Sequence, residues 1–201
     1  MLTSAATYPQ VMRRELLRLR SNATINVINS GRVGDDPRQH RTFERDVLTH
    51  TLDLVVWQLG TNDVAWGGRP DDRLKSSIVE GVRALKAGSA DAALMDLQYA
   101  PWVLASAYTS TMEAIIAGVA KQEHVGPFSR FALMRNWIEA GAGQRALVSL
   151  DGLHNTADGY DCIGRALAPA ISNSARSPPK LEASEVPIMP QRQIRAGRPY
   201  C

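Results

Sequence analysis

The sequence is poor in cysteine and contains no long hydrophobic segment. Its 201 residues include only two cysteines, Cys162 and Cys201. Two are too few for a framework of disulfides or for a zinc site built from cysteines. The longest apolar runs, such as 54–57 and 114–120, are far shorter than the ~20 residues that a bilayer requires. We therefore expect no membrane span, and we expect a globular protein with no zinc cluster.

Most of the chain also lacks an excess of charge of either sign. The formal net charge of +3 arises from residues 173–201, whereas residues 1–172 carry equal numbers of acidic and basic side chains. The segment 173–201 also holds five of the eleven prolines and has little apolar periodicity. We expect one domain over 1–172 and a basic, Pro-rich, mostly disordered tail over 173–201. No nucleic acid is expected as a partner of the domain, although an arginine-rich arm for RNA or a partner is an alternative for the tail.

Helical and strand patterns alternate before the tail. Apolar residues at helical spacing predict five helices, over 9–20, from Asp71 or Asp72 to about 85, around 112–119, over 131–140 and over 156–171. Apolar or β-branched runs predict strands over 24–29, 52–59, 92–97 and 125–131. This alternation predicts an α/β fold with a mostly parallel sheet and helices on both faces. Ligands of such folds bind beyond the carboxyl ends of the strands, so the segments that follow strands are candidates for chemistry.

Two of these segments offer hydrogen-bond donors. In 29–36, Gly31 and Gly34 allow a tight turn that brings backbone N–H groups towards a ligand, but a turn with a helix cap at Asp35 or Asp36 is an alternative. In 60–63, the amide of Asn62 can donate to a developing oxyanion, but an Asx turn explains the same residues. The segment after 92–97, with Gln98, Tyr99, Pro101 and Trp102, either lines a pocket or belongs to the core.

A third segment pairs a carboxylate with an imidazole. Asp151 and His154 are three residues apart on a loop that enters a helix. A carboxylate at this spacing can hold the ring Nδ1 and leave Nε2 free to act as a base. A purely structural role for His154 is the alternative.

In this order and at these spacings, the three segments resemble the SGNH (GDSL-type) hydrolases over roughly residues 7–171. The resemblance implies a flavodoxin-like three-layer α/β/α sandwich and a Ser-His-Asp mechanism acting on carboxylic esters. It assigns His154 and Asp151 as catalytic, and Gly34 and Asn62 as oxyanion-hole donors. It implies a small-molecule ester as the partner and no metal or organic cofactor.

The sequence departs from this family at its beginning. The family places its nucleophilic serine in a Gly-Asp-Ser-like turn after a first strand, upstream of the helix that starts here at Pro9. Residues 1–7 contain no apolar strand and no Gly-x-Ser, and Ser4 lies only five residues before Pro9. We do not expect Ser4 to be the nucleophile, which stays unknown.

The expectation is therefore an N-terminally truncated hydrolase that lacks its first strand and its serine. A non-catalytic remnant that binds a small ester or an acetylated sugar is the alternative. The missing strand would lie between 24–29 and 52–59, so these two strands would either pair directly or leave backbone groups unpaired. No signal peptide is visible, but localisation stays open because truncation could have removed one.

Overall fold

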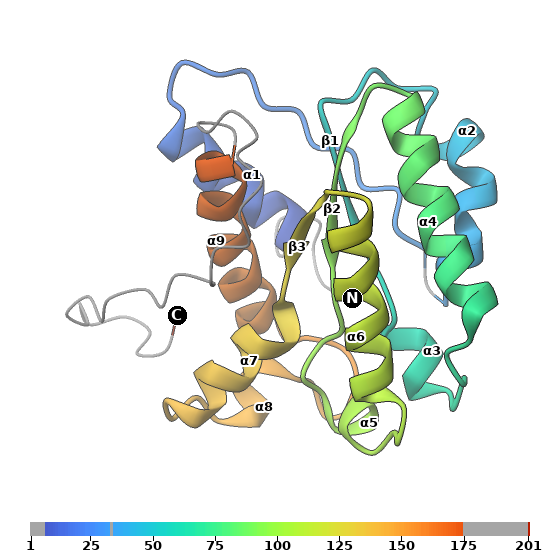
Figure 1. Ribbon diagram of the computed structural model, residues 1–201. Coiled ribbons are helices and arrows are strands. Elements are labelled where there is room, and N and C mark those ends of the chain that lie inside the picture. Colours follow the sequence, from blue (N-terminus) through green and yellow to red (C-terminus); the bar gives the residue numbers. More distant parts are fainter. Residues whose placement is uncertain (1–6, 33, 175–200) are drawn as a thin grey trace. The chain divides into compact units, whose positions relative to one another are not determined.

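Figure 1 shows the computed structural model, which describes residues 7–32, 34–174 and 201. The contacts divide the chain into two compact units. One unit comprises residues 28–135 and 150–154, and the other comprises 1–27, 136–149 and 155–201. Gly34, Asn62, Asp151 and His154 all belong to the first, which we call the sheet unit.

The sheet unit contains three parallel strands in the order β1 (Leu54–Gln58), β2 (Asp91–Met95) and β3 (Gly126–Phe128). Leu54 lies opposite Asp91, and Ala93 lies opposite Gly126. Leu94 and Met95 of the central strand are fully buried. A continuous apolar strand with this burial is typical of a parallel sheet, as the run at 92–97 predicts.

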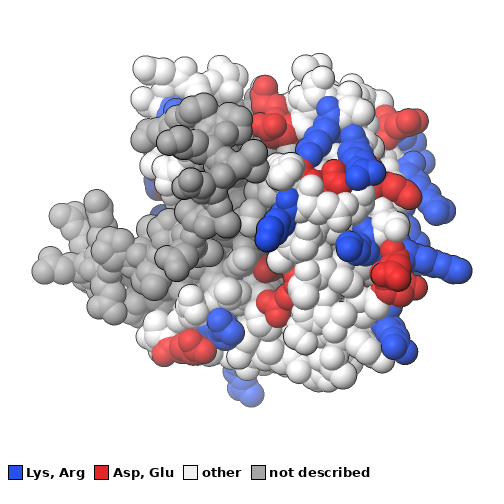
Figure 2. Space-filling view, in the orientation of Figure 1, with Lys and Arg blue, Asp and Glu red and all other residues white. Residues whose placement is uncertain are grey.

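Among the described residues of this unit, three helices lie where the sequence predicts them, whereas four shorter helices were not predicted. α4 (Asp72–Ala87) begins where the carboxylate of Asp71 accepts a hydrogen bond from Leu74 N at 2.9 Å. Its buried stripe includes Ile78, Val82 and Leu85. Lys and Arg side chains gather on the side of α4, at the right of Figure 2. The remaining helices are η2 (Pro37–Thr42), α2 (Phe43–Asp46), α3 (Thr61–Ala65), α5 (Pro101–Leu104), α6 (Thr109–Gln122) and α7 (Arg130–Glu139), whose last residues belong to the other unit.

The strand predicted over 24–29 is wrong, because these residues adopt no regular structure. The carbonyl of Ile25 instead accepts a hydrogen bond from Arg13 Nε at 2.8 Å. Among the residues that the structure describes, β1 pairs with β2 on one edge and with no strand on the other. Leu54, Val55 and Val56 are accordingly half-buried, rather than covered on both faces as their apolar run predicts. A β-branched run forms a strand only where a neighbour satisfies its backbone groups.

The second unit packs α1 (Tyr8–Leu19) against α9 (Ala157–Ser174), with α8 (Gln144–Leu147) beside α9. Gly164 permits the close approach of the two long helices, because a Cβ there would lie 2.6 Å from Val11 Cβ. Cys162 and Cys201 form a disulfide with their Cα atoms 5.5 Å apart, which the sequence did not predict. The tail predicted over 173–201 otherwise falls almost entirely outside the described residues and stays a prediction. No described helix is long and apolar enough to cross a bilayer.

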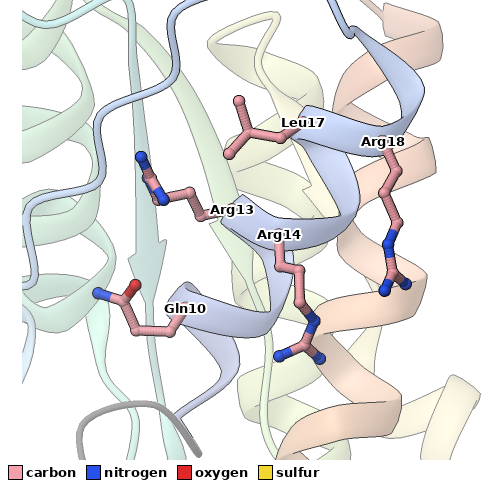
Figure 3. Close-up of a pocket in the computed structure, with 5 residues that line it drawn as sticks. All are labelled: Gln10, Arg13, Arg14, Leu17 and Arg18. Atoms are coloured by element: carbon pink, nitrogen blue, oxygen red, sulfur yellow. The ribbon is translucent and has the colours of Figure 1, made fainter.

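An open hollow of about 430 Å³ runs along α1 (Figure 3). Its lining residues all come from this one helix: Gln10, Arg13, Arg14, Leu17 and Arg18. Arg13 is already engaged with Ile25, and Arg14 forms an ion pair with Asp161 at 3.1 Å. The hollow includes none of the predicted site residues.

We predict that Gly60→Ala destabilises the sheet unit. Gly60 joins β1 to α3 with φ +82°, and an added Cβ would lie 2.7 Å from Met112 Cγ on α6. The left-handed conformation alone costs an L-residue about 1–2 kcal/mol, and the overlap adds to this cost. Gly118→Ala on α6 is the matched control, because it meets nothing within 4 Å and lies within a helix, where alanine should stabilise. Equal melting temperatures for the two variants would contradict the prediction.

Candidate active site

The turn after β1 places Asn62 against the loop that carries Gly34. Asn62 lies in the first turn of α3, and its Nδ2 donates to the carbonyl of Asp35 at 2.9 Å. This hydrogen bond joins segments 27 residues apart and holds Asn62 against the residue that follows Gly34. Gly34 has φ +82°, and no atom outside its immediate chain neighbours lies within 4 Å of the position that a Cβ would occupy. The backbone there is accessible to a ligand.

The alternative proposed for the Gly34 loop, a helix cap, is also present. Asp36 is the N-cap of η2, and its Oδ1 accepts a hydrogen bond from Arg38 N at 2.8 Å. The side-chain hydrogen bond from Arg38 also lowers the pKa of Asp36. The two roles are compatible, because Asp36 anchors the loop while Gly34 lies two residues before it.

Asp151 and His154 form the contact that their spacing predicts. Asp151 Oδ2 lies 2.8 Å from His154 Nδ1, while Oδ1 accepts hydrogen bonds from the backbone N–H groups of Leu153 and His154, both at 2.9 Å. One carboxylate therefore fixes both the loop and the ring, and Nε2 points away from it. The two side chains are 50% and 61% exposed, respectively, so the pair is open to a substrate.

A buried hydrogen-bond network holds this loop at the carboxyl end of the sheet. The Gln98 side chain donates to the carbonyl of Leu153, and Gln98 N donates to Thr61 Oγ1 at 3.3 Å. Arg130, which is also buried, donates through Nη2 to Thr61 Oγ1 at 3.1 Å and to the carbonyl of Asp96 at 2.7 Å. The network thus links segments that follow all three strands to the residue next to His154.

The segment after β2 divides between core and surface. Gln98 is buried, and Tyr99 packs edge-on against Phe131 with ring centroids 5.0 Å apart. Trp102 remains half exposed, and its backbone N–H donates to the carbonyl of Gly152 at 3.1 Å. Gln98 therefore belongs to the core, whereas a pocket-lining role for the other residues of the segment stays a prediction.

Sequence reasoning missed Thr61, Asp96 and Arg130. Thr61 and Arg130 each follow a strand of the sheet, which is the signal that could have drawn attention to them. Nothing in their local sequence shows that an arginine from one strand end reaches a threonine 69 residues away.

Two carboxylates near these strand ends titrate close to neutral pH. Burial, reinforced by the negative charge of Asp36, raises the pKa of Asp63 to about 6. Burial also raises the pKa of Asp96 to about 6, against the hydrogen bond from Phe131 N and the charge of Arg130. Within the described part of the chain, no group of three His, Cys, Asp or Glu residues is arranged to hold a metal ion. Ser4 lies outside the described residues.

We predict that Asp63→Asn makes the stability of the protein fall less as the pH rises. Unfolded Asp63 loses its proton near pH 3.8, whereas folded Asp63 keeps it up to about pH 6. Wild-type stability should therefore fall as the pH rises between these values, relative to the variant, which carries no charge there. Melting temperatures measured from pH 4 to 8 test this expectation. The two proteins should differ least near pH 4, and a constant difference across the range would contradict the assignment.

Solved structures with the same fold are esterases and related hydrolases. An acetylxylan esterase from Geobacillus stearothermophilus, Axe2, is 20% identical, with a TM-score of 0.69 over 82% of this chain and 80% of that one. The psychrotrophic esterase EstA from Pseudoalteromonas sp. is 16% identical, with a TM-score of 0.71 over 88% of this chain and 91% of that one. A lipase/acylhydrolase from Enterococcus faecalis is 16% identical, with a TM-score of 0.69 over 83% and 85%.

These likenesses confirm the predicted SGNH hydrolase fold, an α/β fold with a parallel sheet. No curated protein is significantly similar to the chain in sequence. A family match, in contrast, extends over residues 2–177 and so covers both units described above. On this match, the chain belongs to the non-GDSL lipase-like family.

Proposed function

We propose that the protein hydrolyses carboxylic esters through a serine, His154 and Asp151. The observation that carries the proposal is the 2.8 Å contact between Asp151 Oδ2 and His154 Nδ1, on a solvent-exposed loop tied to the end of β2. The esterases that share the fold support the same chemistry.

In the proposed mechanism, the serine hydroxyl attacks the ester carbonyl carbon and transfers its proton to His154 Nε2. Asp151 holds the ring through Nδ1 and stabilises the imidazolium that forms. Collapse of the tetrahedral intermediate releases the alcohol, which takes the proton back from His154. Water then attacks the acyl-serine in the same way, giving the carboxylic acid and the free serine.

The oxyanion of each tetrahedral intermediate would be held by the Gly34 N–H and the Asn62 amide. Asn62 uses one N–H for the carbonyl of Asp35, and an amide has a second N–H for a ligand. Preorganised donors of this kind stabilise the charge that develops in the transition state. The hydrogen bond to Asp35 supports the proposal because it fixes Asn62 beside the Gly34 loop.

The serine itself is the part of the proposal without an assigned residue. A strand added parallel to β1, on the edge that is unpaired among the described residues, would end beside α3 and Asn62. A serine just after such a strand would reach the same end of the sheet as His154. If no serine reaches this position, the protein is instead a small-ester-binding relative of the esterases.

Hydrolysis of 4-nitrophenyl acetate by the purified protein and by Asn62→Ala tests the proposal. With a serine at the position described above, we expect turnover, with kcat about 10²–10³-fold lower in the variant because one oxyanion donor is lost. Asn136→Ala, which removes an exposed amide from α7, is the control and should leave kcat unchanged. A folded wild-type protein without turnover would refute the hydrolase proposal in favour of the binding protein.

A further inference from the structure

The sheet unit contains a second histidine that contacts a carboxylate. His40 lies in η2, and its Nε2 is 3.1 Å from Oε2 of Glu80 on α4. Its Nδ1 is 3.0 Å from the carbonyl oxygen of Pro37. The side chain of His40 is only 10% exposed, whereas that of Glu80 is 64% exposed. Both nitrogens of a nearly buried ring are therefore engaged, and we call these two contacts the His40 clamp.

The two contacts together determine the charge of the ring. A carbonyl oxygen only accepts hydrogen bonds, and so does an ionised carboxylate. A neutral imidazole has one N–H and one bare nitrogen, so it can donate to only one of the two oxygens. Its bare nitrogen would then face the lone pairs of the other oxygen. The clamp therefore requires His40 in its doubly protonated, positively charged form.

The clamp lies where η2 packs closely on α4. A Cβ at Gly81 of α4 would lie 2.9 Å from His40 Cβ, so the glycine permits η2 to approach the helix. The same Cβ would lie 2.4 Å from Cη2 of Trp57 on β1, which shows how tightly this place is filled. The His40 ring is thus held by packing as well as by its two hydrogen bonds.

η2 follows directly on the loop that carries Gly34. Its N-cap is Asp36, two residues after Gly34, and Pro37 is its first residue. Asp35, just before the cap, accepts the hydrogen bond from the Asn62 side chain. A displacement of Pro37 would therefore move the residues that hold the Gly34 loop against Asn62.

We propose that charged His40 is a positioning residue of the candidate active site, which holds η2 and the adjoining Gly34 loop on α4. When the pH rises and the ring loses one proton, one of its two hydrogen bonds must break. The folded structure favours the charged ring, so the stabilisation is complete at acidic pH and decreases as the pH rises. The effect on catalysis rests on the proposed function, whereas the clamp itself does not.

Other charged groups near η2 must be separated from this effect. In the part of the chain that the structure describes, Glu80 is the only charged group that bonds to the His40 ring. Burial raises the pKa of Asp63 to about 6, and Asp63 interacts with the charges of Asp36 and Arg38. Its ionisation would also act on the start of η2. The remaining charged residues of η2, α2 and α4 are in ion pairs or exposed: Asp36–Arg38, Arg45–Asp46, Arg83–Glu123, Arg41, Glu44, Asp72, Arg73, Lys75 and Lys86.

Hydrogen exchange of residues 36–43 at pH 6 and pH 8, corrected for the intrinsic effect of pH, tests the clamp. The Asp63→Asn protein is used throughout, so that Asp63 contributes nothing. We expect exchange about two- to fivefold faster at pH 8, the range that corresponds to loss of a solvent-exposed ion pair. Glu80→Gln should remove most of this pH dependence, because its amide can accept from the charged ring or donate to the neutral one. Glu44→Gln on α2 is the matched control and should keep it.

The positioning role is tested by the ratio of kcat in Glu80→Gln to kcat without this substitution, for 4-nitrophenyl acetate. Both proteins contain His154, so its own ionisation cancels in the ratio. We expect a ratio near one at pH 6 that rises about two- to fivefold at pH 8, where only the variant keeps the clamp.

Exchange that does not depend on pH, or a dependence that Glu80→Gln leaves unchanged, would overturn the clamp. A pH-dependent clamp with a constant kcat ratio would overturn the positioning role. The expected exchange behaviour in a protein that hydrolyses no ester would uphold the clamp and count against the proposed function.

Discussion

The Arg130→Met variant is expected to melt about 10 °C or more below the wild type. Arg130 is almost fully buried and donates hydrogen bonds to Thr61 Oγ1 and to the carbonyl of Asp96. Hydrogen bonds from a charged donor contribute about 1.5–3 kcal/mol each, and each kcal/mol lost shifts the melting temperature of a chain of this length by about 2–4 °C. Methionine fills similar space but satisfies neither acceptor. The acceptors then remain buried without Arg130.

Differential scanning fluorimetry of Arg130→Met against Arg135→Met measures this effect. Arg135 lies on the same helix but is exposed, so its replacement should change the melting temperature by only a degree or two. The Arg130 variant should also show an increased pKa for Asp96, because the nearby positive charge is gone. Similar melting temperatures for the two variants would show that the buried network does not stabilise the sheet unit.

Replacement of His154 by alanine is expected to reduce ester turnover by a factor on the order of 10⁴–10⁶. Without Nε2, nothing accepts the serine proton and nothing returns a proton to the leaving alcohol. The loss should appear in kcat, with little change in KM, because the imidazole acts on the reacting groups. Steady-state kinetics with 4-nitrophenyl acetate measure both constants.

The control for this variant is His50→Ala, which removes an exposed imidazole from the same unit. It should retain wild-type turnover, and both proteins should melt near the wild-type temperature because His154 is largely exposed. Turnover that survives in His154→Ala would mean that another group acts as the base.

Features fixed by local sequence were predictable. The start of α4 follows from one cap, Asp71, and its buried face follows from apolar residues at helical spacing. The Asp151–His154 contact is equally local, because a spacing of three residues on a loop suffices for it. In both cases the interacting groups are near neighbours in the chain, so little else in the fold can separate them.

Features that depend on distant partners were not predictable. The β-branched run at 24–29 has strand propensity but forms no strand in the structure. The contact between Asn62 and Asp35 and the network around Arg130 join residues 27 to 69 positions apart. The residues adjacent to these partners in the sequence do not indicate which distant residue each one contacts.

Covalent labelling with a fluorophosphonate tests the central claim most directly, because the reagent reacts only with an activated serine. Intact-mass spectrometry of the wild-type protein should show one adduct, and peptide mapping should place it on a single serine. The His154→Ala protein should react far more slowly under the same conditions. A folded wild-type protein that forms no adduct, or labelling that His154→Ala leaves unchanged, would contradict a serine hydrolase built on Asp151 and His154.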